Sequence, residues 1–264
     1  MSALAGFLDR YQERESLLHR LDARAKLPAA LGFIVAVTFT REGEWLTLAL
    51  LFAPIPLLVA LSRLGAALVL RRSLLALPFV ATAIPLVFTR PGDPVFELPL
   101  TGWTASAEGI RAVATIMARA WIAVLTAVIL VATTPAVELL RALRSLRVPA
   151  LLISTISFAY RYLYVVGDEA QRMIRARDSR SATIPGARAG RSVAWRAGVA
   201  GRMVGSLFVR SLERSERVYA AMQARGYHGE LRFLHNPPLP RTDLALGAAL
   251  VAYGALVQAA AYLR

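Results

Sequence analysis

Five long apolar runs divide this chain and limit the folds it can adopt. They cover residues 27–40, 45–61, 73–89, 112–133 and 243–263. A membrane-crossing helix needs ~20 predominantly apolar residues, so the first run is short by that measure. Lipid offers no partners to backbone polar groups, so a span in a chain like this is helical. The runs predict an all-α integral membrane protein with about five transmembrane helices.

Positive charge is concentrated in one segment of the chain. The formal net charge is +14, and between Pro135 and Arg241 there are 18 arginines against seven acidic residues. Basic loops are retained on the cytoplasmic side of a membrane. A DNA-binding interpretation of the charge conflicts with the apolar runs, so no nucleic-acid partner is expected. The predicted organisation is a cytoplasmic N-terminal segment (1–26), four transmembrane helices (27–134), a cytoplasmic coupling region (135–241) and a last transmembrane helix (242–264).

The shorter loops alternate in charge in the way that an inside N-terminus requires. Residues 1–26 carry five basic residues, and the loop after the second run carries Arg63, Arg71 and Arg72. The turn after the first run has only Arg41, and residues 90–108 have one basic residue against three acidic ones. The alternation predicts a multi-pass protein with its N-terminus in the cytoplasm.

The arginine-rich segment itself predicts three helices, two of them long. Apolar residues recur at helical spacing from Pro135 to Arg147, and longer helices are expected from Pro149 to about Arg180 and from about Trp195 to Arg225. A breaker with Pro185 and Gly186 separates the long helices.

A sixth span is the alternative for the first half of the first long helix. Residues 150–166 are strongly apolar, but Arg161 would then lie in mid-span at a cost of at least ~2.5 kcal/mol. A sixth span would also place the arginine-rich part outside. The first long helix is therefore predicted to stay out of the membrane.

Small residues form a stripe on the second long helix. Ala197, Gly201 and Gly205 lie at i, i+4 and i+8. Small residues let two helices cross at close backbone distance, so the two long helices are predicted to cross there. The alternative is an incidental richness in alanine and glycine.

Both long helices end on an arginine between small residues. The first ends in Ser179-Arg180-Ser181 and the second in Ala224-Arg225-Gly226, and a shift of 45 residues superposes Arg180 on Arg225. A guanidinium on a helix end can enter a partner's groove and pair bidentately with a carboxylate. The alternative is that each arginine merely complements the helix dipole. Ala176-Arg177-Asp178 is a rival for the first motif.

Chemistry within the chain itself is not indicated. Lys26, the single lysine, follows Ala25, whereas a Walker A loop needs glycine before its lysine, so the chain is not a P-loop ATPase. No nucleophile–base pair or paired carboxylates stand out in the spans. Cysteine is absent, and the histidines, His19, His228 and His235, lack a third ligand nearby. We expect no catalytic residue, no metal site and no bound cofactor.

These motifs resemble the T component of energy-coupling factor (ECF) transporters, in particular the cobalt-type, CbiQ-like branch of the EcfT/CbiQ family. The resemblance covers nearly the whole chain. Asp9-Arg10-Tyr11 and residues 18–27 resemble the segment before the first span, with Ala23 where proline is common, and residues 213–227 resemble the second Ala-Arg-Gly motif. Counted from Glu169, the first motif falls on Ser179-Arg180-Ser181, whereas the rival ends on an aspartate that would oppose docking.

The resemblance implies a non-catalytic coupling subunit in the bacterial inner membrane. Its arginine motifs would dock into two ATP-binding-cassette ATPases, which hold ATP and Mg, and its crossed helices would transmit their movement to a substrate-binding membrane S component. The cargo implied is cobalt or nickel. A T component for a vitamin such as biotin, a membrane enzyme, and a scaffold binding anionic lipid through its arginines are the alternatives.

Overall fold

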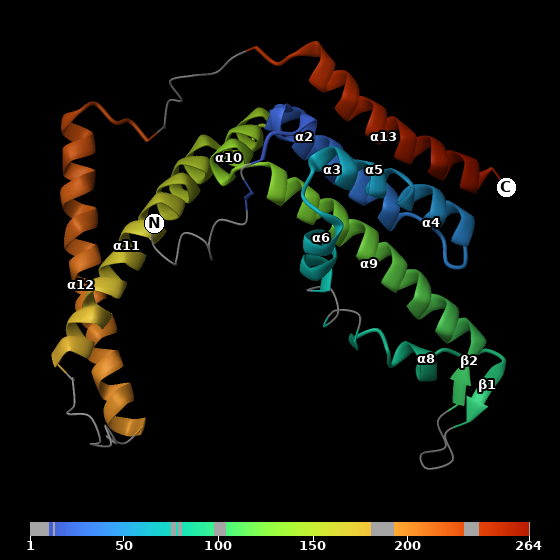
Figure 1. The fold of residues 1–264 in the computed structure, drawn as a ribbon, viewed down its shortest axis with the longest axis horizontal. Helices are drawn as coiled ribbons and strands as arrows, with labels where there is room; N and C mark the ends of the chain where they lie inside the picture. Colours follow the sequence, from blue (N-terminus) through green and yellow to red (C-terminus); the bar gives the residue numbers. More distant parts are fainter. Residues whose placement is uncertain are drawn as a thin grey trace. The chain divides into compact units, whose positions relative to one another are not determined.

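The computed structural model describes residues 11–12, 14–74, 78, 81–97, 104–180, 193–229 and 238–263. These residues fall in two compact units. The bundle unit comprises the described residues up to 145 together with 238–263, and the helix-pair unit comprises those between 146 and 229. Helices dominate both units (Figure 1). The expectation of an all-α membrane fold is thus confirmed.

The bundle unit contains short and long helices and one small hairpin. In chain order its elements are α2 (Leu17–Arg20), α3 (Ala23–Thr38), α4 (Trp45–Phe52), α5 (Pro54–Ser62), α6 (Ala66–Ser73), α8 (Leu86–Thr89), β1 (Pro94–Glu97), β2 (Thr104–Ser106), α9 (Ala107–Thr133), α10 (Ala136–Ser145) and α13 (Arg241–Tyr262). The two strands pair antiparallel. The helix-pair unit consists of α11 (Ala150–Arg180) and α12 (Val193–Ala224).

Helix α3 lies at the centre of the bundle unit and packs against α9, α10 and α13. Its Phe33 and Val37 are fully buried, together with Leu51 of α4. Asp22 caps the N-terminus of α3, with Oδ1 accepting a hydrogen bond from the amide of Arg24 at 2.8 Å. A central helix this buried holds the neighbouring helices in one core.

Helix α13 approaches α3 closely because glycines lie at the contact. A Cβ atom at Gly254 would lie 3.1 Å from Cβ of Ala36, and one at Gly247 would lie 3.1 Å from the carbonyl oxygen of Ala25. Small residues at such positions let helices in a membrane bring their backbones together. Close packing through small residues is therefore found between α3 and α13.

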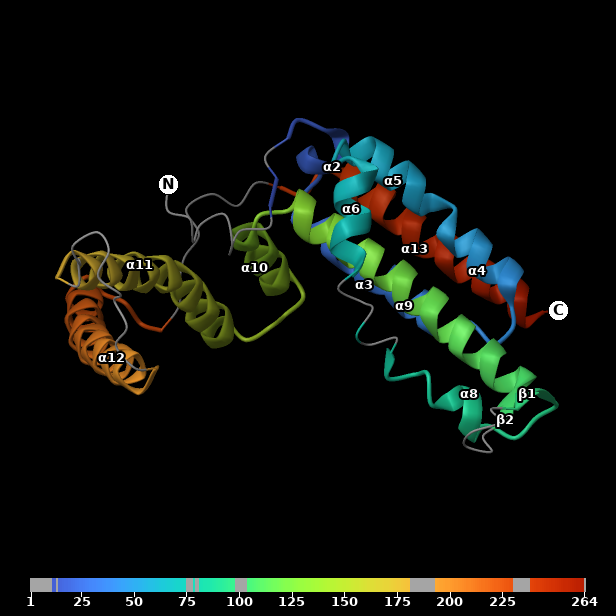
Figure 2. The same cartoon turned by 60° about the horizontal axis from the view of Figure 1, so that its bottom comes forward.

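Polar side chains of α13 add hydrogen bonds to backbone carbonyls of the neighbouring helices. Tyr253 donates to the carbonyl of Leu50 at 2.7 Å, and Gln258 Nε2 donates to the carbonyl of Ala36 at 2.6 Å. The Tyr262 hydroxyl donates to Phe39 O at 3.2 Å. These bonds fix the position of α13 along α3 and α4, which it follows in Figure 2.

Four helical segments of the described chain are long and apolar enough to cross a membrane. They are Trp45–Ser62, Ala107–Thr133, Ala150–Arg180 and Arg241–Tyr262. Three of them confirm predicted runs, and the first, α4 with α5, is broken at Ala53 before Pro54, which cannot donate a backbone hydrogen bond. Ala150–Arg180 belongs to this group by its length and composition, although it contains Arg161.

Two predicted spans differ from expectation. The first forms α3, whose 16 residues extend about 24 Å at 1.5 Å per residue, and it begins at Ala23 rather than Leu27. The third, residues 73–89, does not form a helix of spanning length in the part of the chain that the structure describes. There α6 ends at Ser73 and the four-residue α8 starts after Pro85.

Helix α10 packs on α3, although it was predicted to begin the coupling region. Its Ala142 is fully buried against Ala23 and Leu27 of α3. The reason is its strongly amphipathic pattern, whose apolar side meets the start of α3. The short helix is thereby part of the bundle unit.

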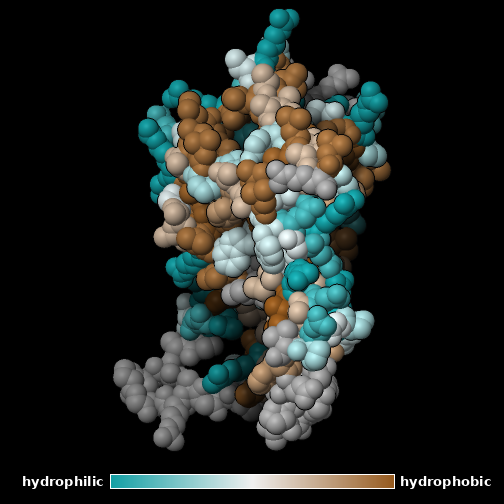
Figure 3. Space-filling model, turned by 90° about the vertical axis from the view of Figure 1, so that its right-hand side faces the viewer, coloured by the Kyte–Doolittle hydropathy of each residue, from teal (hydrophilic) through white to brown (hydrophobic). Residues whose placement is uncertain are grey.

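Large apolar side chains remain exposed over the bundle unit. Leu57 is 60% exposed and Leu256 is 69% exposed, and apolar side chains cover much of the face seen in Figure 3, with hydrophilic ones between and around them. A soluble domain rarely leaves so much contiguous apolar surface open to water. The surface is that of a protein immersed in lipid.

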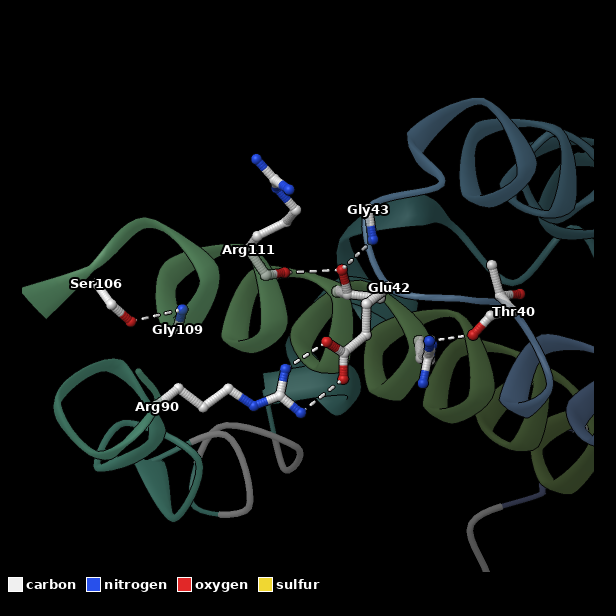
Figure 4. A network of polar contacts seen from close by, with 9 residues as sticks. Thr40, Glu42, Gly43, Arg90, Ser106, Gly109 and Arg111 are labelled. Carbon is white, nitrogen blue, oxygen red and sulfur yellow. Dashed lines mark hydrogen bonds and ion pairs between the residues drawn. The ribbon is translucent and has the colours of Figure 1, made fainter. Parts of the chain in front are cut away.

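One end of the bundle unit carries a polar network that joins two loops (Figure 4). Arg90 faces Glu42 with two contacts, Nη2 to Oε1 at 3.0 Å and Nη1 to Oε2 at 2.5 Å. Thr115 Oγ1 accepts a hydrogen bond from the amide of Gly43 at 3.2 Å, and Arg119 donates to the carbonyl of Thr40. The loops after the first and third runs therefore lie at the same end, as their similar charge predicted.

Candidate functional site

The candidate site is built on the two long helices of the helix-pair unit. Helix α11 starts directly after Pro149, whose carbonyl accepts the amides of Leu152 and Ile153 at 3.0 and 3.3 Å. Proline suits this place because the first helical residues have no intrahelical partner for their N–H groups. Both predicted long helices are confirmed within two residues of their expected ends.

The end of α12 has a geometry that places Arg225 at the helix C-cap. Gly226 adopts φ +80°, and its amide donates to Gln223 O at 2.9 Å, while the amide of Tyr227 donates to Met222 O at 3.0 Å. These two bonds define a Schellman motif, in which glycine takes the left-handed position. The predicted stop at Gly226 is confirmed, and Arg225 is exposed there.

The first motif lies at the end of α11. Arg180 is the last residue of the helix and is exposed, as is Ser179, while Ser181 lies outside the described residues. In the rival register the guanidinium of Arg177 already contacts the Asp178 carboxylate, with Nη2 2.6 Å from Oδ1. A partner carboxylate would have to compete with Asp178 for Arg177.

Helices α11 and α12 meet at a carboxylate that the sequence did not single out as a contact. Arg210 Nη1 and Arg214 Nη2 of α12 lie 3.2 and 3.7 Å from the two oxygens of Glu169 on α11. Arg172, one turn on from Glu169, lies 2.5 Å from Oε2. Glu169 is only 16% exposed in its side chain, so three arginines shield one carboxylate. No periodic pattern within one helix could have revealed this pairing.

Among the described residues, the contact between α11 and α12 does not lie at the predicted small-residue stripe. Ala197, Gly201 and Gly205 are all exposed, and a Cβ at either glycine would meet no described atom within 4 Å. The contact with α11 occurs further along α12, where arginines and aromatic residues reach across. Long side chains hold these helices apart, so glycine is not required at their contact.

A groove of about 1000 Å³ runs between the first half of α11 and the second half of α12. The rings of Phe158 and Tyr227 meet edge-on across it, with centroids 6.0 Å apart. Further apolar lining comes from Tyr162, Tyr219 and Met222. Because early residues of α11 face late residues of α12, the two helices run in opposite directions.

The histidines are not gathered in the described chain. His228 lines the groove, and His19 lies in the bundle unit, where Nε2 donates to Gln12 O at 2.9 Å and Nδ1 contacts Ser16 Oγ at 2.6 Å. His235 lies outside the described residues. Among the residues the structure covers, no three histidine, aspartate or glutamate side chains converge on a point that could hold a metal ion.

Comparison with known proteins shows which family this chain matches. The chain matches the family of cobalt transport proteins, CbiQ, over residues 14–234. An energy-coupling factor transporter transmembrane protein EcfT of Limosilactobacillus fermentum is 30% identical over 223 residues, which cover 81% of this chain and 80% of that protein. A cobalt transport protein CbiQ of Rhodobacter capsulatus is 30% identical over 178 residues, covering 67% of this chain and 70% of that protein.

A relative without an assigned role is similar over a longer stretch. An uncharacterized protein of Methanocaldococcus jannaschii is 29% identical over 245 residues, covering 90% of this chain and 81% of that protein. The match of the family extends over both units, from before α2 to beyond α12. With its apolar helices and its paired long helices, the chain belongs to the CbiQ/EcfT family of transporter transmembrane proteins.

Proposed function

We propose that this protein is the T component of an ECF-type importer, which couples two ABC-type ATPases to a membrane-embedded S component. The observation that carries the proposal is the placement of two exposed arginines, Arg180 and Arg225, at the ends of two long helices that contact each other. Each guanidinium is free to enter a groove of a separate ATPase and pair with a carboxylate.

The surroundings of the two arginines favour docking over a purely local role. A dipole-complementing arginine needs no particular neighbours. Here Ser179 and Ala224 leave space beside the guanidinium, and the Schellman motif turns the chain away directly after Arg225. The end of α12 can therefore enter a concave surface without steric obstruction from the described residues that follow it.

The apolar surface of α11 supports contact with a membrane-embedded partner. Leu151, Leu152 and Ile156 are 67%, 52% and 48% exposed, next to the groove between the long helices. Such a surface would be covered by lipid or by an apolar helix of the S component. The helix-pair unit would thus receive the ATPases at its arginine ends and the S component on its apolar side.

The proposed location is the bacterial inner membrane, with the N-terminus and the helix-pair unit in the cytoplasm. The excess of arginine between residues 135 and 241 supports this orientation. The chain itself would hydrolyse no ATP, because the phosphate loop is missing and ATP and Mg would bind the partner ATPases. Its role is to transmit movement.

Cobalt or nickel ions are the proposed cargo. The family is described as cobalt transport protein, and the Rhodobacter capsulatus relative carries the same name. Relatives named EcfT carry no cargo in their names, so a vitamin such as biotin is the alternative. Uptake of radioactive cobalt, nickel and biotin by cells with and without the transporter genes discriminates between these cargoes.

Copurification tests the function directly. The tagged chain, expressed in the cells from which its gene comes, should bring two ATPase subunits and a small membrane protein with it in mild detergent. A chain that binds anionic liposomes but recovers no ATPase would instead be the lipid-binding scaffold. ATP hydrolysis by the purified chain, free of ATPase subunits, would contradict the proposed non-catalytic role.

A further inference from the structure

We propose that Glu169 is the pivot about which α11 and α12 turn relative to each other, acting as a positioning residue for coupling. The inference rests on the proposed function, because it assigns the point at which movements of the two docked helix ends are combined. Glu169 lies between the helices and would not itself touch an ATPase.

The geometry of the contact suits a pivot. The Glu169 carboxylate is reached from α12 by both Arg210 and Arg214, which lie one turn apart. Two long, flexible side chains that converge on one carboxylate hold the two helices at a fixed distance. They can follow a change in crossing angle by rotating about their own bonds, because each guanidinium offers several donors in a fork.

The rest of the interface does not fix the crossing angle by dense packing. No described residue of α12 is buried, and the stripe of Ala197, Gly201 and Gly205 lies open. Toward the start of α11, both helices line the groove of about 1000 Å³. A tightly interdigitated interface resists rotation, whereas a polar contact beside an open groove permits it.

The position of the contact relative to the two arginine motifs strengthens the inference. Arg180 follows Glu169 by 11 residues, and Arg225 follows Arg214 by 11 residues. We call each helix segment from the Glu169 contact to its terminal arginine an arm. At 1.5 Å per residue each arm is about 16 Å long. Because the helices run in opposite directions, the two arms point away from the contact on opposite sides. Equal arms convert equal displacements of two similar ATPases into one symmetric change in crossing angle.

The two helix ends are related by a weak sequence repeat, and the Glu169 contact lies at equivalent positions of that repeat. The shift of 45 residues that superposes Arg180 on Arg225 also places Glu169 on Arg214. The repeat therefore carries opposite charges at a pair of equivalent positions that contact each other, Glu169 and Arg214. This pairing makes the contact self-complementary between the two arms.

The test uses the complete complex with its ATPases, in proteoliposomes and in detergent. Cysteines at the exposed Arg175 and Ala220 of this cysteine-free chain carry spin labels that report the distance between α11 and α12. Glu169→Gln should broaden the distance distribution and lower uptake per ATP hydrolysed about tenfold, a change typical of coupling between sites. Both ATPases should remain bound, because Arg180 and Arg225 are intact.

Arg172→Gln is the matched control, since it removes a partner of the same carboxylate from within α11. It should leave the distance distribution and the coupling ratio unchanged. The pair Glu169→Arg, Arg210→Glu should restore part of the coupling that Glu169→Arg alone removes.

Two results would overturn the pivot. One is wild-type distances and coupling in Glu169→Gln, and the other is an equal loss in Arg172→Gln. If the unaltered chain recovers no ATPases, the proposed function fails instead, and the two failures are thereby distinguished.

Discussion

The guanidinium of Arg177 lies against the carboxylate of Asp178, its immediate neighbour, with Nη2 2.6 Å and Nε 3.0 Å from Oδ1. This local ion pair separates Arg177 from Arg180, which ends the same helix three residues later. The two arginines are rivals for the first docking motif, and their surroundings predict different consequences of reversing their charge.

Charge reversal at the helix ends should weaken ATPase binding in steps. Arg180→Glu and Arg225→Glu should each cost ~2–5 kcal/mol of binding free energy, because a partner carboxylate is left unpaired. The double variant should copurify without ATPases, although the chain still inserts and folds. Arg177→Glu should keep both ATPases, since Asp178 already occupies Arg177. A severe Arg177→Glu with a silent Arg180→Glu would reverse the assignment, and a silent Arg225→Glu would reject docking.

Glycine substitutions should separate the α3–α13 contact from the open stripe. Gly254→Leu forces a side chain into a contact where even Cβ would lie 3.1 Å from Ala36, so it should destabilise the protein by ~1–3 kcal/mol. Gly201→Leu meets no described neighbour and should be neutral or slightly stabilising, since leucine favours helix more than glycine. Thermal unfolding in detergent measures both. Equal losses of stability would place a close contact at Gly201.

Membrane orientation can be tested with single cysteines. A cysteine at Asp93, in the acid-rich loop, should react with an impermeant maleimide added to intact cells, whereas one at the exposed Ala200 of α12 should react only after permeabilisation. Asp93 is preferable to Gly92, where a Cβ would lie 3.1 Å from Glu108. Labelling of Ala200→Cys in intact cells would mean that α11 crosses the membrane in spite of Arg161.

Acidification should loosen the segment before α3 through His19. Burial, assisted by the Lys26 and Arg14 cations, lowers the pKa of His19 below its usual 6.5. Below pH 6.5 the unfolded segment therefore takes up the proton first, so stability falls with pH through the interval between the unfolded and the lower folded pKa. Hydrogen exchange at residues 16–20, corrected for intrinsic rates, should accelerate from pH 7 to pH 5.5.

His19→Gln provides the comparison for this experiment, because glutamine cannot take up the proton. Its exchange at residues 16–20 should not depend on pH after the same correction. A wild-type segment that exchanges equally at both pH values would show that the protonated ring is accommodated beside Gln12 and Ser16.

The sequence predicted the elements whose signals are local. Helices α10, α11 and α12 follow from apolar periodicity, and the stop at Gly226 follows from the freedom of glycine at positive φ. The similar charge of the loops containing Arg41 and Arg90 placed them at one end, where Glu42 pairs with Arg90.

The sequence did not predict which helices touch where. Small residues occur both in the stripe at Gly201 and in α13 at Gly254, and only packing distinguishes the exposed set from the buried one. The Glu169 contact joins residues 41 and 45 positions apart, beyond any helical period. The docking role of Arg180 and Arg225 remains a prediction.

The hydrogen bonds that α13 makes have a consequence for which substitutions this chain can accept. Tyr253, Gln258 and Tyr262 donate to main-chain carbonyls of Leu50, Ala36 and Phe39, and every amino acid supplies such a carbonyl. Substitutions at the three acceptor positions therefore preserve these bonds, whereas substitutions at the three donors remove them. Substitutions can therefore accumulate in α3 and α4 without shifting α13 along them, provided that the three polar side chains of α13 are retained.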